Sequence, residues 1–117
     1  TDVGAGTTFS MLRTLGEAYK VGQLQSYRLR ASEAFYHATL GGAHALRLDD
    51  KIGNFTPGKE ADFIVIDPDV TPLQRLRNRR CKDIYEQLFV LMTLGDERNI
   101  SETWVNGERV WSTAPVG

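Results

Sequence analysis

The sequence contains little cysteine, no long apolar run and almost no net charge. With Cys81 as the only cysteine in 117 residues, it can form neither an intrachain disulfide nor a zinc motif built from several cysteines. No apolar stretch is long enough to cross a bilayer, and no secretion or lipidation signal is present. A formal net charge of −1 gives no overall reason to expect nucleic acid or an anionic membrane as a partner. These absences favour a cytoplasmic location.

The remaining composition is that of an ordinary globular protein, with 41% hydrophobic and 25% charged residues. A chain of this length is expected to fold as one domain that buries roughly two thirds of its unfolded surface. A complete eight-stranded α/β barrel needs about 200 residues or more. Any likeness to a barrel enzyme would therefore concern only part of that enzyme.

Apolar spacing and capping residues predict two well-defined helices. Leucine, alanine and tyrosine side chains recur at helical intervals over residues 11–23, and Ser10 is a good N-cap. A second apolar stripe covers residues 83–94, where Asp83 and Glu86 have the spacing of a capping box. Both segments are therefore expected to pack one face against a core.

Between these helices the sequence predicts two shorter ones. Ser32 can cap a helix over residues 33–40, and the dipeptide Gly41-Gly42 is expected to interrupt it. Thr39 can cap a further short helix that continues to about Leu48. This region should therefore consist of short helices joined by turns.

Two segments are typical of strands. Residues 63–66 form an apolar run between aspartates, which predicts a short buried strand. Asn106-Gly107 lies between residues 103–105 and 108–110 and predicts a two-residue hairpin, because both central residues of a type I′ turn need positive φ. Together with the helices, these strands predict an α+β fold.

The two histidines do not predict a metal site. His37 and His44 are seven residues apart, which would place them on one face of a continuous helix. The expected break at Gly41-Gly42 separates them. Histidines that are hydrogen-bonded or solvated are the favoured interpretation.

A basic run and the cysteine within it are also interpreted as an ordinary surface segment without a binding or catalytic role. Residues 75–82 contain five cationic side chains, which could bind phosphates. No aromatic residues are interleaved with them, so a solvated surface segment is favoured. Cationic neighbours could activate the thiol of Cys81, but no recognisable motif pairs it with a histidine, and a structural or incidental role is favoured.

The first eight residues are small and predict a loop. Gly4 and Gly6 suit a tight turn, but the third glycine of a dinucleotide fingerprint and the Lys-Ser/Thr of a phosphate loop are missing from this segment. Considered alone, Asp2 is simply an acidic residue near a chain end. Local pattern therefore predicts no site here.

Several stretches in combination do indicate a family. They are Thr-Asp-Val-Gly-Ala-Gly at residues 1–6 with Ser-Met-Leu at 10–12, Ala-Thr-Leu-Gly-Gly-Ala at 38–43, the segment 52–62 with its Gly-Lys-Glu-Ala-Asp, and Leu-Gly-Asp-Glu-Arg-Asn-Ile at 94–100. In this order they resemble the C-terminal third of the guanine deaminases, zinc hydrolases of the amidohydrolase superfamily. The Gly-Lys-Glu-Ala-Asp segment is similar to many amidohydrolases, whereas the first and last stretches are more specific.

The resemblance implies a fold and a site residue. It assigns residues 1–48 to the end of barrel strand eight and the C-terminal helices of a (β/α)8 barrel. It assigns residues 49–117 to a composite β-sandwich with an inserted helix at 83–94. Asp2 takes the position of the aspartate that ligates zinc and moves protons in that family, at the strand end where barrel enzymes build their sites. It is the single catalytic and metal-binding residue expected here.

The resemblance also implies an activity, the hydrolysis of guanine to xanthine and ammonia by a zinc enzyme of purine catabolism. The family's histidine ligands match no residues of this sequence, so the isolated chain is expected to bind no zinc and to be inactive. Apolar faces and sheet edges without their usual partners predict a homodimer, or association with the rest of the parent polypeptide.

Two alternatives stay open at the level of sequence. The chain could be a non-catalytic structural or oligomerising module derived from an amidohydrolase. It could equally belong to a related amidohydrolase that acts on another heterocycle, because the residues that contact substrate in the family lie outside the matched stretches.

Overall fold

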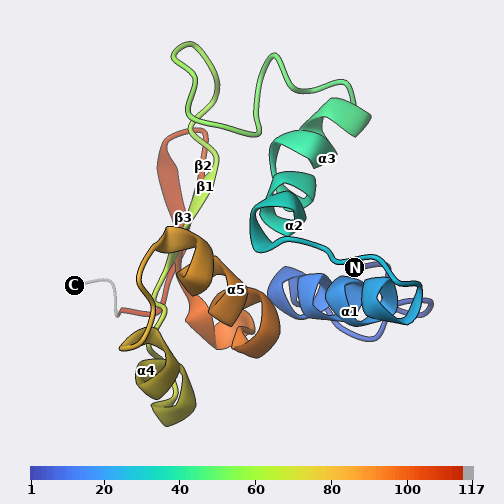
Figure 1. The fold of residues 1–117 in the computed structure, drawn as a ribbon. Coiled ribbons are helices and arrows are strands. Elements are labelled where there is room, and N and C mark those ends of the chain that lie inside the picture. The colour runs from blue at the N-terminus through green and yellow to red at the C-terminus, as the bar shows by residue number, and fades with distance from the viewer. Residues whose placement is uncertain (115–117) are drawn as a thin grey trace. The chain divides into compact units, whose positions relative to one another are not determined.

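A computed structural model describes residues 1–114 and contains five α-helices and a three-stranded sheet (Figure 1). Contacts divide the chain into two compact units, residues 1–35 with 68–99, and residues 36–67 with the segment from Ile100 onward. The predicted α+β class is confirmed. The elements are α1 (Met11–Leu24), α2 (Ala31–Ala38), α3 (Leu40–Ala45), β1 (Phe63–Ile66), α4 (Pro72–Asn78), α5 (Ile84–Leu94), the 3₁₀ helix η1 (Glu97–Asn99), β2 (Ile100–Val105) and β3 (Glu108–Ser112).

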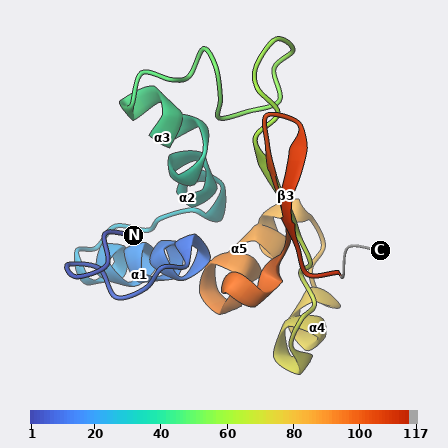
Figure 2. The ribbon, with the colours of Figure 1, turned by 180° about the vertical axis from the view of Figure 1, so that it is seen from behind.

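The first unit is organised around α1 and α5, which pack against each other and lie side by side in both ribbon views (Figures 1 and 2). The prediction of α1 is confirmed, and the side chain of Ser10 accepts a hydrogen bond from the backbone N–H of Arg13 at 3.4 Å. The buried apolar side chains come mainly from these two helices and include Leu12, Leu15, Val90, Leu91 and Met92.

Gly16 permits the close approach of α1 to α5. A Cβ atom at this position would lie 2.7 Å from the carbonyl oxygen of Met92, which is buried. Gly16→Ala is therefore expected to lower the free energy of unfolding by about 1–3 kcal/mol, as overpacking does, although alanine favours a helix by up to about 1 kcal/mol. Urea unfolding of the purified protein measures the change in the free energy of unfolding.

The matched control for this prediction is Ala18→Gly, at an exposed position of the same helix. It measures how much alanine and glycine differ in helix propensity within α1, without any change in packing. If Gly16→Ala left the unfolding midpoint unchanged or raised it, the proposed helix contact would be contradicted.

The prediction of α5 is also confirmed, with one correction at its start. Asp83 is the N-cap, and its Oδ1 accepts a hydrogen bond from the backbone N–H of Glu86 at 2.9 Å. The carboxylate of Glu86, however, accepts from the backbone N–H of Lys82 at 2.6 Å. The predicted capping box is therefore only half formed, because Glu86 reaches back one residue beyond the N-cap.

The sequence analysis missed α4. Thr71 and Gln74 form a complete capping box at its start, and Pro72 occupies the first helical position, where its missing N–H costs nothing. The Thr-Pro-x-Gln spacing was the available signal.

A buried pair of amides joins α4 to the end of α5 and to η1. Gln74 and Asn99 are 1% and 0% exposed, and each donates a hydrogen bond to the other's side-chain oxygen at 3.0 Å. Gln74 also donates to the carbonyl of Leu94 at 2.9 Å, and Asn99 accepts from the N–H of Asp96 at 3.1 Å. The pair therefore satisfies backbone groups at the end of α5 and the start of η1, and ties them to α4, which lies about 20 residues earlier.

The predicted helix over residues 33–40 is wrong in its end point. α2 ends at Ala38, Thr39 separates it from α3, and Gly41 and Gly42 lie inside α3 instead of breaking a helix. A Cβ atom on Gly41 would lie 2.9 Å from the Tyr36 ring, so this glycine permits close packing. Thr39 is the N-cap as predicted, but its side chain makes no capping hydrogen bond.

The sheet has the order β1-β2-β3 and is antiparallel throughout. The predicted hairpin is confirmed, with φ of 50° at Asn106 and 79° at Gly107. The strand at residues 63–66 is confirmed as β1, but its prediction as a buried strand is wrong. Ile64 and Val65 are 47% and 39% exposed, because β1 lies at an edge of the sheet.

The hairpin tip is held by the segment that precedes β1. The backbone N–H of Asn106 donates to Asp62 at 2.8 Å, and that of Gly107 donates to the carbonyl of Ala61 at 3.0 Å. Phe63 of β1 stacks on Trp104 of β2, with ring centroids 5.4 Å apart. The Gly-Lys-Glu-Ala-Asp motif therefore ends in residues that fix the turn of the sheet.

Among residues 1–114, no helix has both the length and the apolar composition that spanning a bilayer requires.

Candidate functional site

Residues 1–6 form a tight turn that is defined by backbone hydrogen bonds. The carbonyl oxygen of Asp2 accepts from the N–H of Ala5 at 3.1 Å and from the N–H of Gly6 at 2.5 Å. Asp2 itself has a φ of 48°, a left-handed conformation that aspartate tolerates better than most residues. The loop prediction is confirmed, and the turn fixes the backbone from which the Asp2 side chain projects.

The two glycines of the turn have different physical roles. Gly4 has a φ of 121°, which side chains rarely permit. Gly6 is required for space, because a Cβ atom there would overlap the carbonyl oxygen of Thr1. The Gly-x-Gly pattern therefore forms a compact turn at Asp2.

Short polar contacts organise the segment between the turn and α1. The hydroxyl of Thr8 accepts from the backbone N–H of Ser10 at 3.0 Å, and the hydroxyl of Thr14 donates to the carbonyl of Ser10 at 3.0 Å. A hollow of about 200 Å³ lies beside the turn, lined by Thr1, Gly6, Thr7, Thr14 and Glu17. Helix α1 and the segment that carries Asp2 therefore border the same hollow.

The carboxylate of Asp2 is exposed and makes no hydrogen bond or ion pair to any residue between 1 and 114. No group of three His, Cys, Asp or Glu side chains that could hold a metal ion occurs in this part of the chain. The residues present therefore do not make a zinc site by themselves, because a catalytic zinc ion normally has three protein ligands. The role predicted for Asp2 stays a prediction.

The histidines have other neighbours. The ring of His37 lies 5.6 Å from that of Tyr36, and Nδ1 of His44 lies 3.3 Å from Oδ2 of Asp49. The hydrogen bond from His44 lowers the pKa of Asp49 below its ordinary value. The structure thus places His44 in a hydrogen-bonded pair with Asp49 at the surface.

The Leu-Gly-Asp-Glu-Arg stretch at residues 94–98 contains a local charge pair. Nη2 of Arg98 lies 2.8 Å from Oδ2 of Asp96, and Nε of Arg98 donates to Oδ1 at 3.0 Å. These hydrogen bonds lower the pKa of Asp96. The pair fixes the turn between α5 and η1, close to the buried amide of Asn99.

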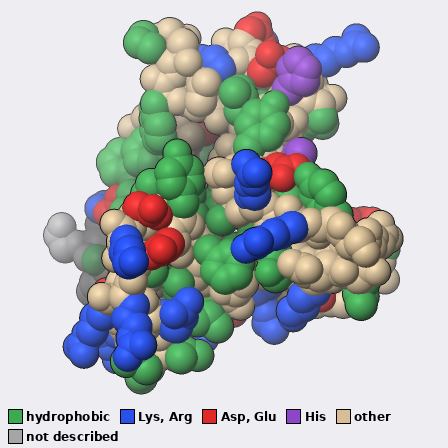
Figure 3. Space-filling model, viewed as in Figure 1, with side chains coloured by type: hydrophobic (Ala, Val, Ile, Leu, Met, Phe, Trp, Pro, Cys, Tyr) green, Lys and Arg blue, Asp and Glu red, His purple; other side chains and the backbone are tan. Residues whose placement is uncertain are grey.

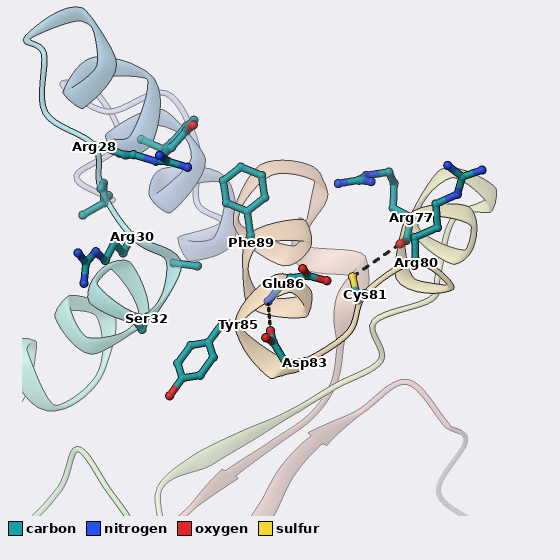
Figure 4. Close-up of a pocket in the computed structure, with 13 residues that line it drawn as sticks. Arg28, Arg30, Ser32, Arg77, Arg80, Cys81, Asp83, Tyr85, Glu86 and Phe89 are labelled. Atoms are coloured by element: carbon teal, nitrogen blue, oxygen red, sulfur yellow. Dashed lines mark hydrogen bonds between the residues drawn. The ribbon is translucent and has the colours of Figure 1, made fainter.

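A second concave surface lies within the first unit, and the sequence analysis did not foresee it. It is a cleft of about 910 Å³. Arg77 and Arg80 come from the basic run, whose side chains gather over α4 and the residues after it (Figure 3). Arg28 and Arg30 reach the same cleft from the link between α1 and α2 (Figure 4).

Cys81 also lines this cleft and is partly exposed. Its thiol donates to the carbonyl of Arg77 at 3.6 Å. The run is a surface segment as predicted, since its arginines are exposed, but two of them share a concavity with cations from elsewhere. No local pattern could have indicated that association.

Comparison with known proteins places the chain in a family. The model of the amidohydrolase family matches residues 1–110. Guanine deaminase of Escherichia coli is 64% identical over 111 residues, which are 95% of this chain and 25% of that protein. Human guanine deaminase is 39% identical over 119 residues, 94% of this chain and 26% of that protein. The chain thus spans about a quarter of the length of these curated relatives.

Solved structures give the same result. The E. coli guanine deaminase superposes with a TM-score of 0.93 at 62% identity, covering 97% of this chain and 27% of that one. Guanine deaminase from Bradyrhizobium japonicum superposes with a TM-score of 0.84 at 36% identity, and the match covers 97% of this chain and 30% of that one. An adenosine deaminase from Xanthomonas campestris with bound zinc, 24% identical with a TM-score of 0.69, shares the fold over 85% of this chain and 21% of its own. This chain belongs to the amidohydrolase family.

Proposed function

We propose that the chain is part of a guanine deaminase, which hydrolyses guanine to xanthine and ammonia. The observation that carries the proposal is the 64% identity to the E. coli guanine deaminase over 95% of the chain. The relatives from mammals, at 37–39% identity, carry the same name. A shared activity across such divergent sequences supports guanine as the substrate.

The fold assignment is part of the same proposal. Residues 1–48 would form the end of barrel strand eight and the helices that follow. Residues 49–117 would contribute to a composite β-sandwich, with the helix at 83–94 inserted. The superposition of 97% of the chain onto 27% of the E. coli guanine deaminase supports a contribution to a larger molecule.

Asp2 is the residue through which this chain would act in catalysis. Its backbone carbonyl is held by Ala5 and Gly6, so the turn can orient the carboxylate without using it as a structural partner. Deamination requires a base that takes a proton from the attacking water and an acid that protonates the amino group, so that it leaves as ammonia when the C–N bond breaks. A single carboxylate can perform both transfers in sequence, and we assign them to the Asp2 oxygens.

Zinc would be a cofactor only of the whole enzyme. Asp2 can supply one ligand, and the other protein ligands would come from residues outside the described part of this chain. When bound, zinc lowers the pKa of a coordinated water to near neutrality. We therefore expect no tight zinc binding by residues 1–117 alone. A homodimer and a cytoplasmic location remain predictions.

The activity can be tested with the purified full-length protein that contains this sequence. Incubation with guanine is expected to give xanthine and ammonia in equal amounts, with adenine and cytosine as control substrates. Turnover of another heterocycle but not guanine would favour a related amidohydrolase. A lack of turnover with every substrate, in a folded and metal-loaded protein, would favour the non-catalytic module.

A further inference from the structure

We propose that the arginine-lined cleft of the first unit binds a purine mononucleotide. Its walls come from α1, the link between α1 and α2 with the start of α2, the end of α4 with the residues after it, and the first turns of α5 (Figure 4). The volume of about 910 Å³ lies within the range of small-molecule sites, roughly 300–1,000 Å³. Residues 1–6 do not line the cleft.

The first argument is the arrangement of positive charge. Arg28 and Arg77 point toward each other from opposite walls, with Phe89 between them (Figure 4). No guanidinium of the four cleft arginines, Arg28, Arg30, Arg77 and Arg80, forms a hydrogen bond or ion pair with a residue in the described part of the chain. Converging cations repel each other unless an anion lies between them, and the planar guanidinium fork matches a phosphate.

The second argument is the aromatic surface beneath these arginines. Phe89 is 37% exposed, and its ring is held edge-on by Tyr19, with centroids 5.5 Å apart and an interplanar angle of 86°. Tyr85, one turn earlier on α5, is 63% exposed and lines the same cleft. Such rings favour stacking with a planar base. Inorganic phosphate would use the arginines but leave this surface uncovered.

The third argument limits the ligand to a single nucleotide. Asp83 and Glu86 also line the cleft. Each uses one carboxylate oxygen for a backbone N–H at the start of α5. These anions would repel an extended chain of phosphates, which argues against a nucleic acid. The second oxygen of Glu86 can accept hydrogen bonds from a base that carries N–H donors, as guanine does.

Guanosine monophosphate is therefore the probe, and binding to the full-length protein is measured by isothermal titration calorimetry. Arg28→Ala and Arg77→Ala are each expected to weaken binding about tenfold or more, because a hydrogen bond to a charged group is lost. Phe89→Leu should weaken it less. Arg79→Ala is the matched control, since Arg79 belongs to the same basic run but does not line the cleft, and it should leave the affinity within about twofold.

Cys81 gives a second readout that localises the ligand. Because its thiol lines the cleft, nucleotide at a concentration near the wild-type Kd should slow its alkylation by iodoacetamide in the wild-type protein and in Arg79→Ala, but much less in Arg28→Ala. Circular dichroism of each variant confirms that it is folded. Neither readout measures deamination, so failure of this proposal is distinguishable from failure of the proposed activity.

Three results would overturn the proposal. Equal affinity for guanosine would show that the phosphate is not recognised, and equal affinity for inorganic phosphate would show that the base is not. Nucleotide binding that is absent, or unaffected by Arg28→Ala and Arg77→Ala, would place the ligand elsewhere or nowhere. Tighter binding of a single-stranded oligonucleotide would indicate a nucleic-acid surface instead.

Discussion

Asp2→Asn in the full-length protein is expected to lower kcat for guanine by about 10²- to 10⁴-fold, the usual contribution of a positioned acid or base. The amide keeps the size of the carboxylate but cannot accept a proton, and it is a weaker metal ligand. KM should change much less than kcat, because the loss concerns proton transfer more than substrate binding. Steady-state kinetics with guanine measures both constants.

Two further variants make this result specific. Asp50→Asn removes a carboxylate from an exposed position and should leave kcat within about twofold. Asp2→Glu retains a carboxylate at an altered distance and should recover part of the activity lost in Asp2→Asn. If Asp2→Asn had the kcat of the wild type, Asp2 would have no catalytic role.

Asn99→Leu is expected to lower the free energy of unfolding by about 2–4 kcal/mol, because each buried polar group left without a partner costs about 1–3 kcal/mol. The substitution removes the acceptor of the Asp96 N–H and breaks both side-chain hydrogen bonds with Gln74. Leucine is also larger than asparagine, so overpacking at this buried position adds to the loss of the hydrogen bonds. Chemical denaturation monitored by circular dichroism measures the change.

A double-mutant cycle measures the interaction energy between Gln74 and Asn99 apart from the contacts that each makes with other residues. Gln74→Leu combined with Asn99→Leu should cost less than the sum of the two single changes, because the amides no longer leave each other unpaired. Asn54→Ala, at an exposed loop position, is the control and should cost less than about 1 kcal/mol. Additive effects, or a stable Asn99→Leu protein, would contradict the network described here.

The sequence predicted correctly those elements that depend mainly on neighbouring residues. The boundaries of α1 followed from Ser10 and the apolar spacing, and the hairpin followed from the positive φ that Asn106 and Gly107 both adopt. In these segments, a few neighbouring residues determine the backbone. Their predictions needed no knowledge of tertiary contacts.

The errors arose where distant contacts decide the role of a residue. Gly41 appeared to break a helix, but it lies within α3, where the Tyr36 ring leaves no room for a side chain. Gln74 and Asn99 are 25 residues apart, and nothing in their local sequence indicates that they pair in the core. Arg28 and Arg77 likewise meet in one cleft only through the packing of the helices.

The candidate site was only partly accessible to sequence reasoning. The glycines near Asp2 predicted a loop, and the structure explains them by a φ of 121° at Gly4 and a close approach at Gly6. The role of Asp2 came from a family resemblance, because a lone carboxylate in a loop carries no local signal of catalysis. Under the proposed function, the other metal ligands and the substrate contacts would come from residues outside the described part of this chain.

Metal content of the full-length protein tests the central claim most directly. Elemental analysis of the purified wild type should give about one zinc ion per chain, as a mononuclear catalytic site requires. Asp2→Ala, after dialysis against a mild chelator, should lose most of that zinc, whereas Asp50→Ala should retain it. Full zinc occupancy in Asp2→Ala under the same dialysis would contradict the assignment of Asp2 as a ligand.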